Sequence, residues 1–88
     1  MLVTTSGLSQ ISRYDMERWG DYWRITDKCF ERLLRGCFDA KKIHIRSYGN
    51  VAVAKAFLDG LALEEIDQGI LEHSDNDYQV IVSAVAVK

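Results

Sequence analysis

The sequence predicts a small α+β domain, and three observations support this. Its 88 residues are the length of one domain. Segments 42–48 and 78–87 have the alternating or β-branched composition of strands, whereas the segments between strands have helical spacing. The predicted order is β-α-β-α-α-β, with residues 1–88 forming one domain. We expect a three-stranded sheet with the C-terminal strand at its centre and helices packed against it.

The composition excludes several classes of protein. Hydrophobic residues make up 48% and charged residues 27% of the chain, which is typical of a folded globule. No apolar run approaches the ~18 residues of a membrane span, and the first five residues do not resemble a signal peptide. The net charge of −2 excludes a generally basic nucleic-acid binder. Cys29 and Cys37 are expected to be small buried hydrophobes in a reducing cytoplasm.

The N-terminal third is predicted to form an edge strand and one long helix. Residues 1–5 are β-prone. Ser12 and Asp15 have the spacing of a capping box, and Gly36 is a plausible end of the helix. Gly20 could mark a kink within it. We expect Trp19 and Trp23 in the core, on a stripe of Met16, Trp19, Trp23, Thr26, Phe30, Leu33 and Cys37.

The middle of the chain alternates and then becomes helical. In segment 42–48, Ile43, Ile45 and Ser47 face one way and the polar residues face the other, which predicts a strand with one wet face. Gly49 is expected to turn the chain, and Asn50 to cap a helix over 51–58. The buried side of that helix is predicted to comprise Ala54, Phe57 and Leu58. Gly60 interrupts it, and a second short helix follows with Leu63, Ile66 and Ile70.

Segment 78–87 is apolar on both faces. Such a strand belongs in the middle of a sheet or at an interface between molecules. Because a domain of this size has little other material to cover it, we expect a homodimer.

Aromatic residues cluster between Tyr14 and Trp23. Four of the nine aromatic residues of the chain lie in these ten positions, interleaved with arginines. Tyr, Trp and Arg are enriched at the energetic centres of protein interfaces. Tyr14, Arg18 and Tyr22 point away from the predicted core stripe, so we expect them to contact a partner protein. Stacking on single-stranded nucleic acid is the alternative for this cluster.

The charges are strongly segregated along the chain. Segment 24–48 has seven basic and three acidic residues, a local charge of +4, whereas segment 56–87 has seven acidic residues and no basic one. This polarity favours steering toward a charged partner or head-to-tail self-association. The predicted partner-binding residues are Tyr14, Arg18, Tyr22, Arg24, Arg32, Arg35, Lys41, Lys42, Arg46, Glu64, Glu65 and Asp67.

No constellation of residues predicts catalysis. His44 and His73 have no nucleophile at a suitable spacing, and the acids at 72–77 lack the ligand series of a calcium loop. Segment 51–71 partly matches a helix-turn-helix, but Glu64, Glu65 and Asp67 would repel phosphates. We therefore predict no catalytic residue, no metal and no cofactor.

The sequence accordingly favours a small non-enzymatic protein that binds another protein or complex and inhibits or adapts it. The preferred form of this hypothesis is a phage- or plasmid-type antagonist of host machinery such as CRISPR or restriction systems. The alternative is a nucleic-acid-binding transcriptional regulator that uses the basic 24–48 segment. A membrane partner is not expected.

Overall fold

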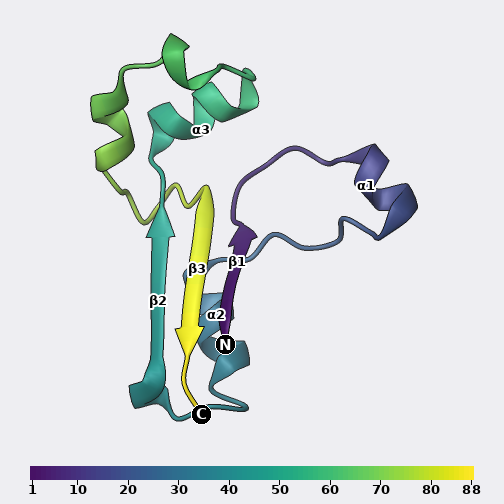
Figure 1. Ribbon diagram of the computed structural model, residues 1–88, viewed down its shortest axis with the longest axis vertical. Helices are drawn as coiled ribbons and strands as arrows, with labels where there is room; N and C mark the ends of the chain where they lie inside the picture. Colours follow the sequence, from purple (N-terminus) through teal and green to yellow (C-terminus); the bar gives the residue numbers. More distant parts are fainter.

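A three-stranded antiparallel sheet forms the centre of the molecule (Figure 1). The computed structural model describes all 88 residues. Strands β1 (Leu2–Ser6) and β2 (Ile43–Tyr48) both pair with β3 (Ile81–Ala86), so the strand order is β1-β3-β2. The predicted α+β class, the order of the strands and the central position of the C-terminal strand are confirmed.

One face of the sheet carries the hydrophobic core. Residues paired across an antiparallel sheet point to the same face, so the side chains of Val3, Ile45 and Ala84 lie on one side. Helix α2 (Asp27–Leu34) packs on this side (Figure 1). The core cluster is small and comprises Phe30, Leu34, Val82, Ala84 and Ala86.

The opposite face of the sheet is open. Of the six residues of β3, only Val82, Ala84 and Ala86 are buried, whereas Ile81 and Val85 are exposed. Within one chain, β3 is therefore covered on one face only. The reason is that α2 makes the main helix contact with the sheet, and it covers one side.

The single long helix predicted from Ser12 to Gly36 is wrong. The chain forms α1 (Arg13–Arg18), an irregular stretch from 19 to 26, and then α2. Ser12 caps α1 as predicted, because its side chain accepts from the Asp15 N–H at 3.2 Å. Gly20 then adopts φ +90°, and Thr26 caps a new helix by accepting from Cys29 N–H.

This break moves the predicted stripe out of the core. Trp19 and Trp23 are 72% and 74% exposed, so their assignment to the core was wrong. Of the stripe, Phe30 is buried, whereas Leu33 and Cys37 are exposed and lie on the outer side of the α2 region. Cys29 is half-buried, and both thiols are free.

Residues 50–77 form a lobe at one end of the sheet (Figure 1). The lobe contains α3 (Val51–Leu58) and two 3₁₀ turns, η2 (Leu63–Glu65) and η3 (Gln68–Glu72), in place of the predicted second helix. Helix α3 buries Ala54 and Ala56, whereas Phe57 and Leu58 are exposed, contrary to prediction. Phe57 and Leu58 stay exposed because α3 packs mainly on η3, which is a single short turn.

Asn50 joins two segments of the lobe. It is the only buried polar residue of the chain. Its side-chain oxygen accepts from the Val53 N–H at 3.0 Å, which confirms the predicted cap of α3. Its amide also donates to the carbonyls of Ile70 and His73, each at 2.7 Å. One side chain therefore holds both ends of the lobe.

We expect Gly49→Ala to destabilise the fold more than Gly60→Ala. Both glycines have positive φ, +121° and +71°, which costs an L-residue about 1–2 kcal/mol. At Gly49 an added Cβ would also lie 2.6 Å from Val80 Cγ2, whereas the space at Gly60 is open. The further overpacking adds about 1–3 kcal/mol. Urea unfolding of both variants measures the difference, and equal losses would contradict the packing argument.

Candidate functional site

A long loop leaves the end of β1 and returns to the same place. Two backbone hydrogen bonds close its base: Gly7 N–H donates to the Val80 carbonyl and Ile25 N–H to the Ser6 carbonyl, both at 3.0 Å. We call residues 8–24 the aromatic excursion, because it contains Tyr14, Trp19, Tyr22 and Trp23. Figure 1 shows that it projects to the side of the sheet and includes α1.

Arg24 and Asp21 brace the excursion from within. The Arg24 guanidinium bonds both carboxylate oxygens of Asp21, at 2.6 and 3.0 Å, and also donates to the carbonyls of Gln10 at 2.7 Å and Trp23 at 2.9 Å. The Ser12 N–H donates to the same carboxylate at 2.8 Å. These bonds join the outgoing and returning arms of the loop. Arg24 therefore has a structural role within the excursion.

The braced excursion presents its aromatic side chains to solvent. Arg18 lies over the Tyr14 ring, with its guanidinium carbon 3.4 Å from the ring centroid, and the Tyr14 and Trp19 rings meet edge to face at 6.4 Å. Trp19, Tyr22 and Trp23 are each more than 70% exposed. Aromatic side chains that are held in a defined shape serve as anchors in protein-binding surfaces.

The charge of Asp21 makes the brace sensitive to acid. Hydrogen bonds from Arg24 and from the Ser12 backbone lower the pKa of Asp21 from 3.8 to about 2. Because the folded pKa is depressed, the stabilisation is complete above pH 3.8 and is lost as the pH falls through about 2. We expect carbon-13 NMR of the Asp21 carboxyl to titrate near pH 2, and the Asp21→Asn variant to lose the protection of the Ser12 amide at neutral pH. A carboxyl midpoint near 3.8 would contradict the brace.

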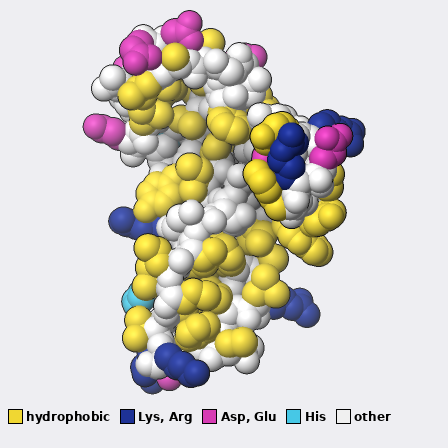
Figure 2. Space-filling view, turned by 45° about the vertical axis from the view of Figure 1, so that its right-hand side comes forward, with side chains coloured by type: hydrophobic (Ala, Val, Ile, Leu, Met, Phe, Trp, Pro, Cys, Tyr) yellow, Lys and Arg dark blue, Asp and Glu magenta, His cyan; other side chains and the backbone are white.

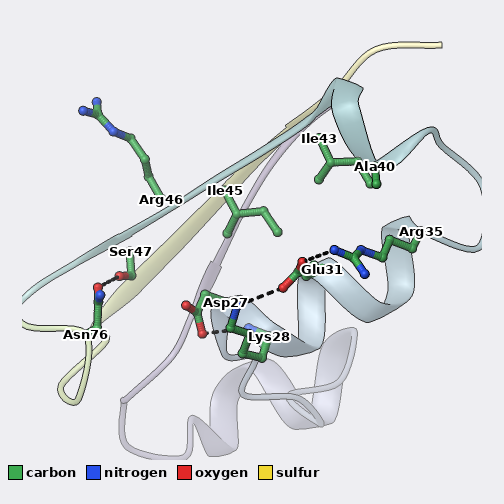
Figure 3. Close-up of a pocket in the computed structure, with 10 residues that line it drawn as sticks. All are labelled: Asp27, Lys28, Glu31, Arg35, Ala40, Ile43, Ile45, Arg46, Ser47 and Asn76. Atoms are coloured by element: carbon green, nitrogen blue, oxygen red, sulfur yellow. Dashed lines mark hydrogen bonds and ion pairs between the residues drawn. The ribbon is translucent and has the colours of Figure 1, made fainter.

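The predicted basic residues gather at the end of the sheet away from the lobe. Arg32 and Arg35 lie on or just after α2, and Lys41 and Lys42 lie in the 3₁₀ turn η1 (Ala40–Lys42). A groove of about 430 Å³ separates α2 from β2 nearby (Figure 3). There Glu31 pairs with Lys28 at 3.0 Å and with Arg35, and it is the hydrogen bond from Lys28 that chiefly lowers the pKa of Glu31. Arg32, Lys41 and Lys42 make no ion pair.

The predicted acidic residues lie in the lobe, and two of them have local roles. Glu65 accepts from the Ala62 N–H at 2.7 Å, and Asp67 accepts from the Gly69 N–H at 3.0 Å. Each therefore shapes its own 3₁₀ turn. Glu64 makes no hydrogen bond or ion pair within the chain and is exposed.

The structure sorts the predicted site residues into three separate groups. The first is in the aromatic excursion, the second is the basic end, and the third is in the lobe; Arg46 stands apart on the open face of the sheet. Sequence reasoning missed Trp19 and Trp23 as surface residues, although Gly20 between them was a signal of a broken helix. It also left out Ile81 and Val85, although the two-faced apolar pattern of their strand pointed to an interface.

No group of three or more His, Cys, Asp or Glu side chains could hold a metal ion. None of the helices has both the length and the hydrophobicity to cross a bilayer. Comparison with protein-family models, with curated proteins and with solved structures finds no match to this chain.

Proposed function

We propose that this chain is a protein-binding module that docks its aromatic excursion against a larger protein or complex, which it inhibits or adapts. One observation supports this above the others: Trp19, Tyr22 and Trp23 are largely exposed on a loop that its own hydrogen bonds hold in shape. A preorganised loop loses little conformational entropy on binding, and Trp and Tyr bury a large area each.

The arrangement of charges favours a protein over a nucleic acid as the partner. Of the seven basic residues in 24–48, Arg24, Lys28 and Arg35 are already paired with carboxylates. The groove between α2 and β2 contains Asp27 and Glu31 as well as basic groups. A surface that follows a phosphate backbone needs unpaired cations in a continuous row. Retention of DNA or RNA at low salt that disappears at higher salt would instead support the regulator hypothesis.

The biological setting that we propose is inhibition of host machinery. An antagonist of host machinery of the phage or plasmid type needs a small, stable surface and no catalytic group. The free thiols of Cys29 and Cys37 suit the reducing cytoplasm in which such an antagonist acts.

Affinity capture with paired variants tests the proposal. The tagged chain is mixed with lysate, and proteins bound by the wild type are quantified against those bound by the double variant Trp19→Ala/Trp23→Ala. We expect a specific partner to be lost with the double variant, because each truncation at an interface centre costs about 2 kcal/mol or more. Leu33→Ala, on the outer side of α2, is the matched control for removal of an exposed apolar side chain.

The charged groups provide a second comparison. Reversal of Arg32 and Arg35, or of Glu64, Glu65 and Asp67, identifies which charged end contributes to capture. Capture that survives removal of both tryptophans contradicts the proposed surface.

A further inference from the structure

The sheet face opposite α2 has no cover, and it mixes polar side chains with four large apolar or aromatic ones, Leu2, Tyr48, Ile81 and Val85, which are all exposed. Its register aligns the side chains in three rows across β1, β3 and β2. Val85 is 40% and Ile81 50% exposed, although both belong to the central strand. Where one face of an antiparallel sheet is exposed to water, the side chains on that face are normally polar. The rows are Leu2, Val85 and His44, then Thr4, Ser83 and Arg46, then Ser6, Ile81 and Tyr48.

The molecule has more surface than a folded monomer of its mass. Its accessible surface is 6737 Å², whereas a 10 kDa monomer is expected to expose about 5,200 Å². Its radius of gyration is 14.5 Å, against about 12 Å for a compact chain of this length. A stable interface removes about 800 Å² from each partner. The excess is larger than the area of one such interface, and the open face contributes to it together with the projecting excursion and lobe.

Hydrophobic side chains also continue beyond the sheet. Figure 2 shows them over the sheet and on the lobe above it. Val87, Phe57, Leu61 and Leu63 are among the exposed hydrophobic residues of these two regions. A partner that covers both the open face and part of the lobe would bury more than the three rows alone.

The charges are polarised along the direction of the strands. Acidic side chains gather on the lobe, and basic side chains lie at the opposite end and also on the projection at the upper right (Figure 2). Two copies packed face to face with their strands running in the same direction would place lobe against lobe. The carboxylates of the two lobes would then repel each other. Packed with the strands reversed, each lobe meets the basic end of the other copy, and both contacts are attractive.

We propose that the occupant of the open face is a second copy of this chain, packed face to face with its strands reversed. The two-fold axis lies between the sheets and perpendicular to the strands, as a closed isologous dimer requires. The middle row of Thr4, Ser83 and Arg46 then lies at the axis. Because β2 is an edge strand, the two Arg46 side chains lie at the margin of the interface and extend to solvent. The Val85 row of each copy packs on the Ile81 row of the other, at the ~10 Å spacing of stacked sheets.

Pairing of sheet edges would not satisfy the same observations. The outer edges of β1 and β2 have no strand partner, so an edge-to-edge dimer is sterically open to the chain. Such a dimer would leave Ile81 and Val85 in water, because their side chains point out of the sheet plane. The exposure of Ile81 and Val85 thus favours the face over the edge.

The first test measures the mass of the purified chain in solution. Light scattering and sedimentation across a range of concentrations should give twice the 10.0 kDa of one chain. We expect Val85→Lys and Ile81→Lys to give monomers. The milder Val85→Thr keeps the β-branched shape, remains folded by circular dichroism, and should weaken the dimer about tenfold or more.

Two controls separate this interface from other surfaces. Leu33→Lys places the same charge on the outer side of α2 and should leave the dimer intact. Trp19→Ala/Trp23→Ala should also leave it intact, so failure of the dimer and failure of the proposed docking surface are distinguishable. A wild-type monomer at high concentration overturns the proposal, as does a dimer that survives both lysine variants.

The second test determines the relative direction of the two copies. Glu64 and Glu72 make no hydrogen bond or ion pair in the chain, and neither do the side chains of Lys41 and Lys42. Reversal of either pair, Glu64→Lys/Glu72→Lys or Lys41→Glu/Lys42→Glu, should weaken the dimer about tenfold, and the four-residue variant should restore it. A dimer unaffected by the single reversals overturns the reversed packing.

Discussion

Phe30→Ala is expected to remove a large fraction of the stability of the protein. Phe30 is one of five residues in the core cluster and its only aromatic member. Truncation of a buried Phe costs about 3–5 kcal/mol, whereas a chain of this length has a total stability of about 4–13 kcal/mol. No other layer of side chains can compensate, since the second face of the sheet has no helix. Urea unfolding followed by circular dichroism measures the loss.

Leu33→Ala is the matched control for this prediction. Leu33 lies on the same helix but is 59% exposed. A surface truncation of this kind changes stability by about 0.5 kcal/mol or less. Comparable losses for the two variants would show that α2 does not pack on the sheet through Phe30.

Asn50→Ala is expected to release the lobe while the sheet remains folded. The substitution removes the cap of α3, which contributes about 1 kcal/mol, and two further hydrogen bonds of about 1 kcal/mol each. The carbonyls of Ile70 and His73 would be left without their partner in a half-buried position. Because opening the lobe returns both carbonyls to water, we expect local rather than global unfolding. Hydrogen exchange should accelerate throughout 51–73 and remain slow in β3.

Two further variants separate the roles of Asn50. Asn50→Asp keeps an oxygen that can cap α3 but cannot donate to Ile70 or His73, so it should loosen η3 more than α3. Asn76→Ala removes an exposed amide that accepts from Ser47 Oγ at 3.0 Å and should have little effect. Slow exchange in the lobe of Asn50→Ala would contradict the role assigned to this side chain.

The strands could be predicted because their patterns agree with their environments. The alternation of 42–48 places Ile43 and Ile45 toward α2 and Arg46 toward solvent, as observed. The β-branched run near the C-terminus correctly identified the central strand. Local signals for caps at Ser12 and Asn50 also proved right, because these are short-range hydrogen bonds with fixed spacing.

The helical stripe could not be interpreted from spacing alone. Steps of three and four residues through Trp19, Trp23 and Phe30 fit one helix, but they also arise when a loop separates two short helices. Two features break the single helix into two short ones: the positive φ of Gly20, and the capping of a new helix by Thr26. The aromatic excursion therefore emerged only once the backbone was known, and so did the exposure of the tryptophans.

The position of β3 also affects how the chain folds. Neither β1 nor β2 contacts the other, so each must wait for the strand that comes last in the chain. Residue 2 pairs with residue 85, which requires closure of almost the whole chain before the sheet can form. Folding should thus be slow for a domain of this size, because non-local pairing is costly to initiate. During synthesis the first two strands remain unpaired until β3 is available, and in that interval their edges are exposed to aggregation.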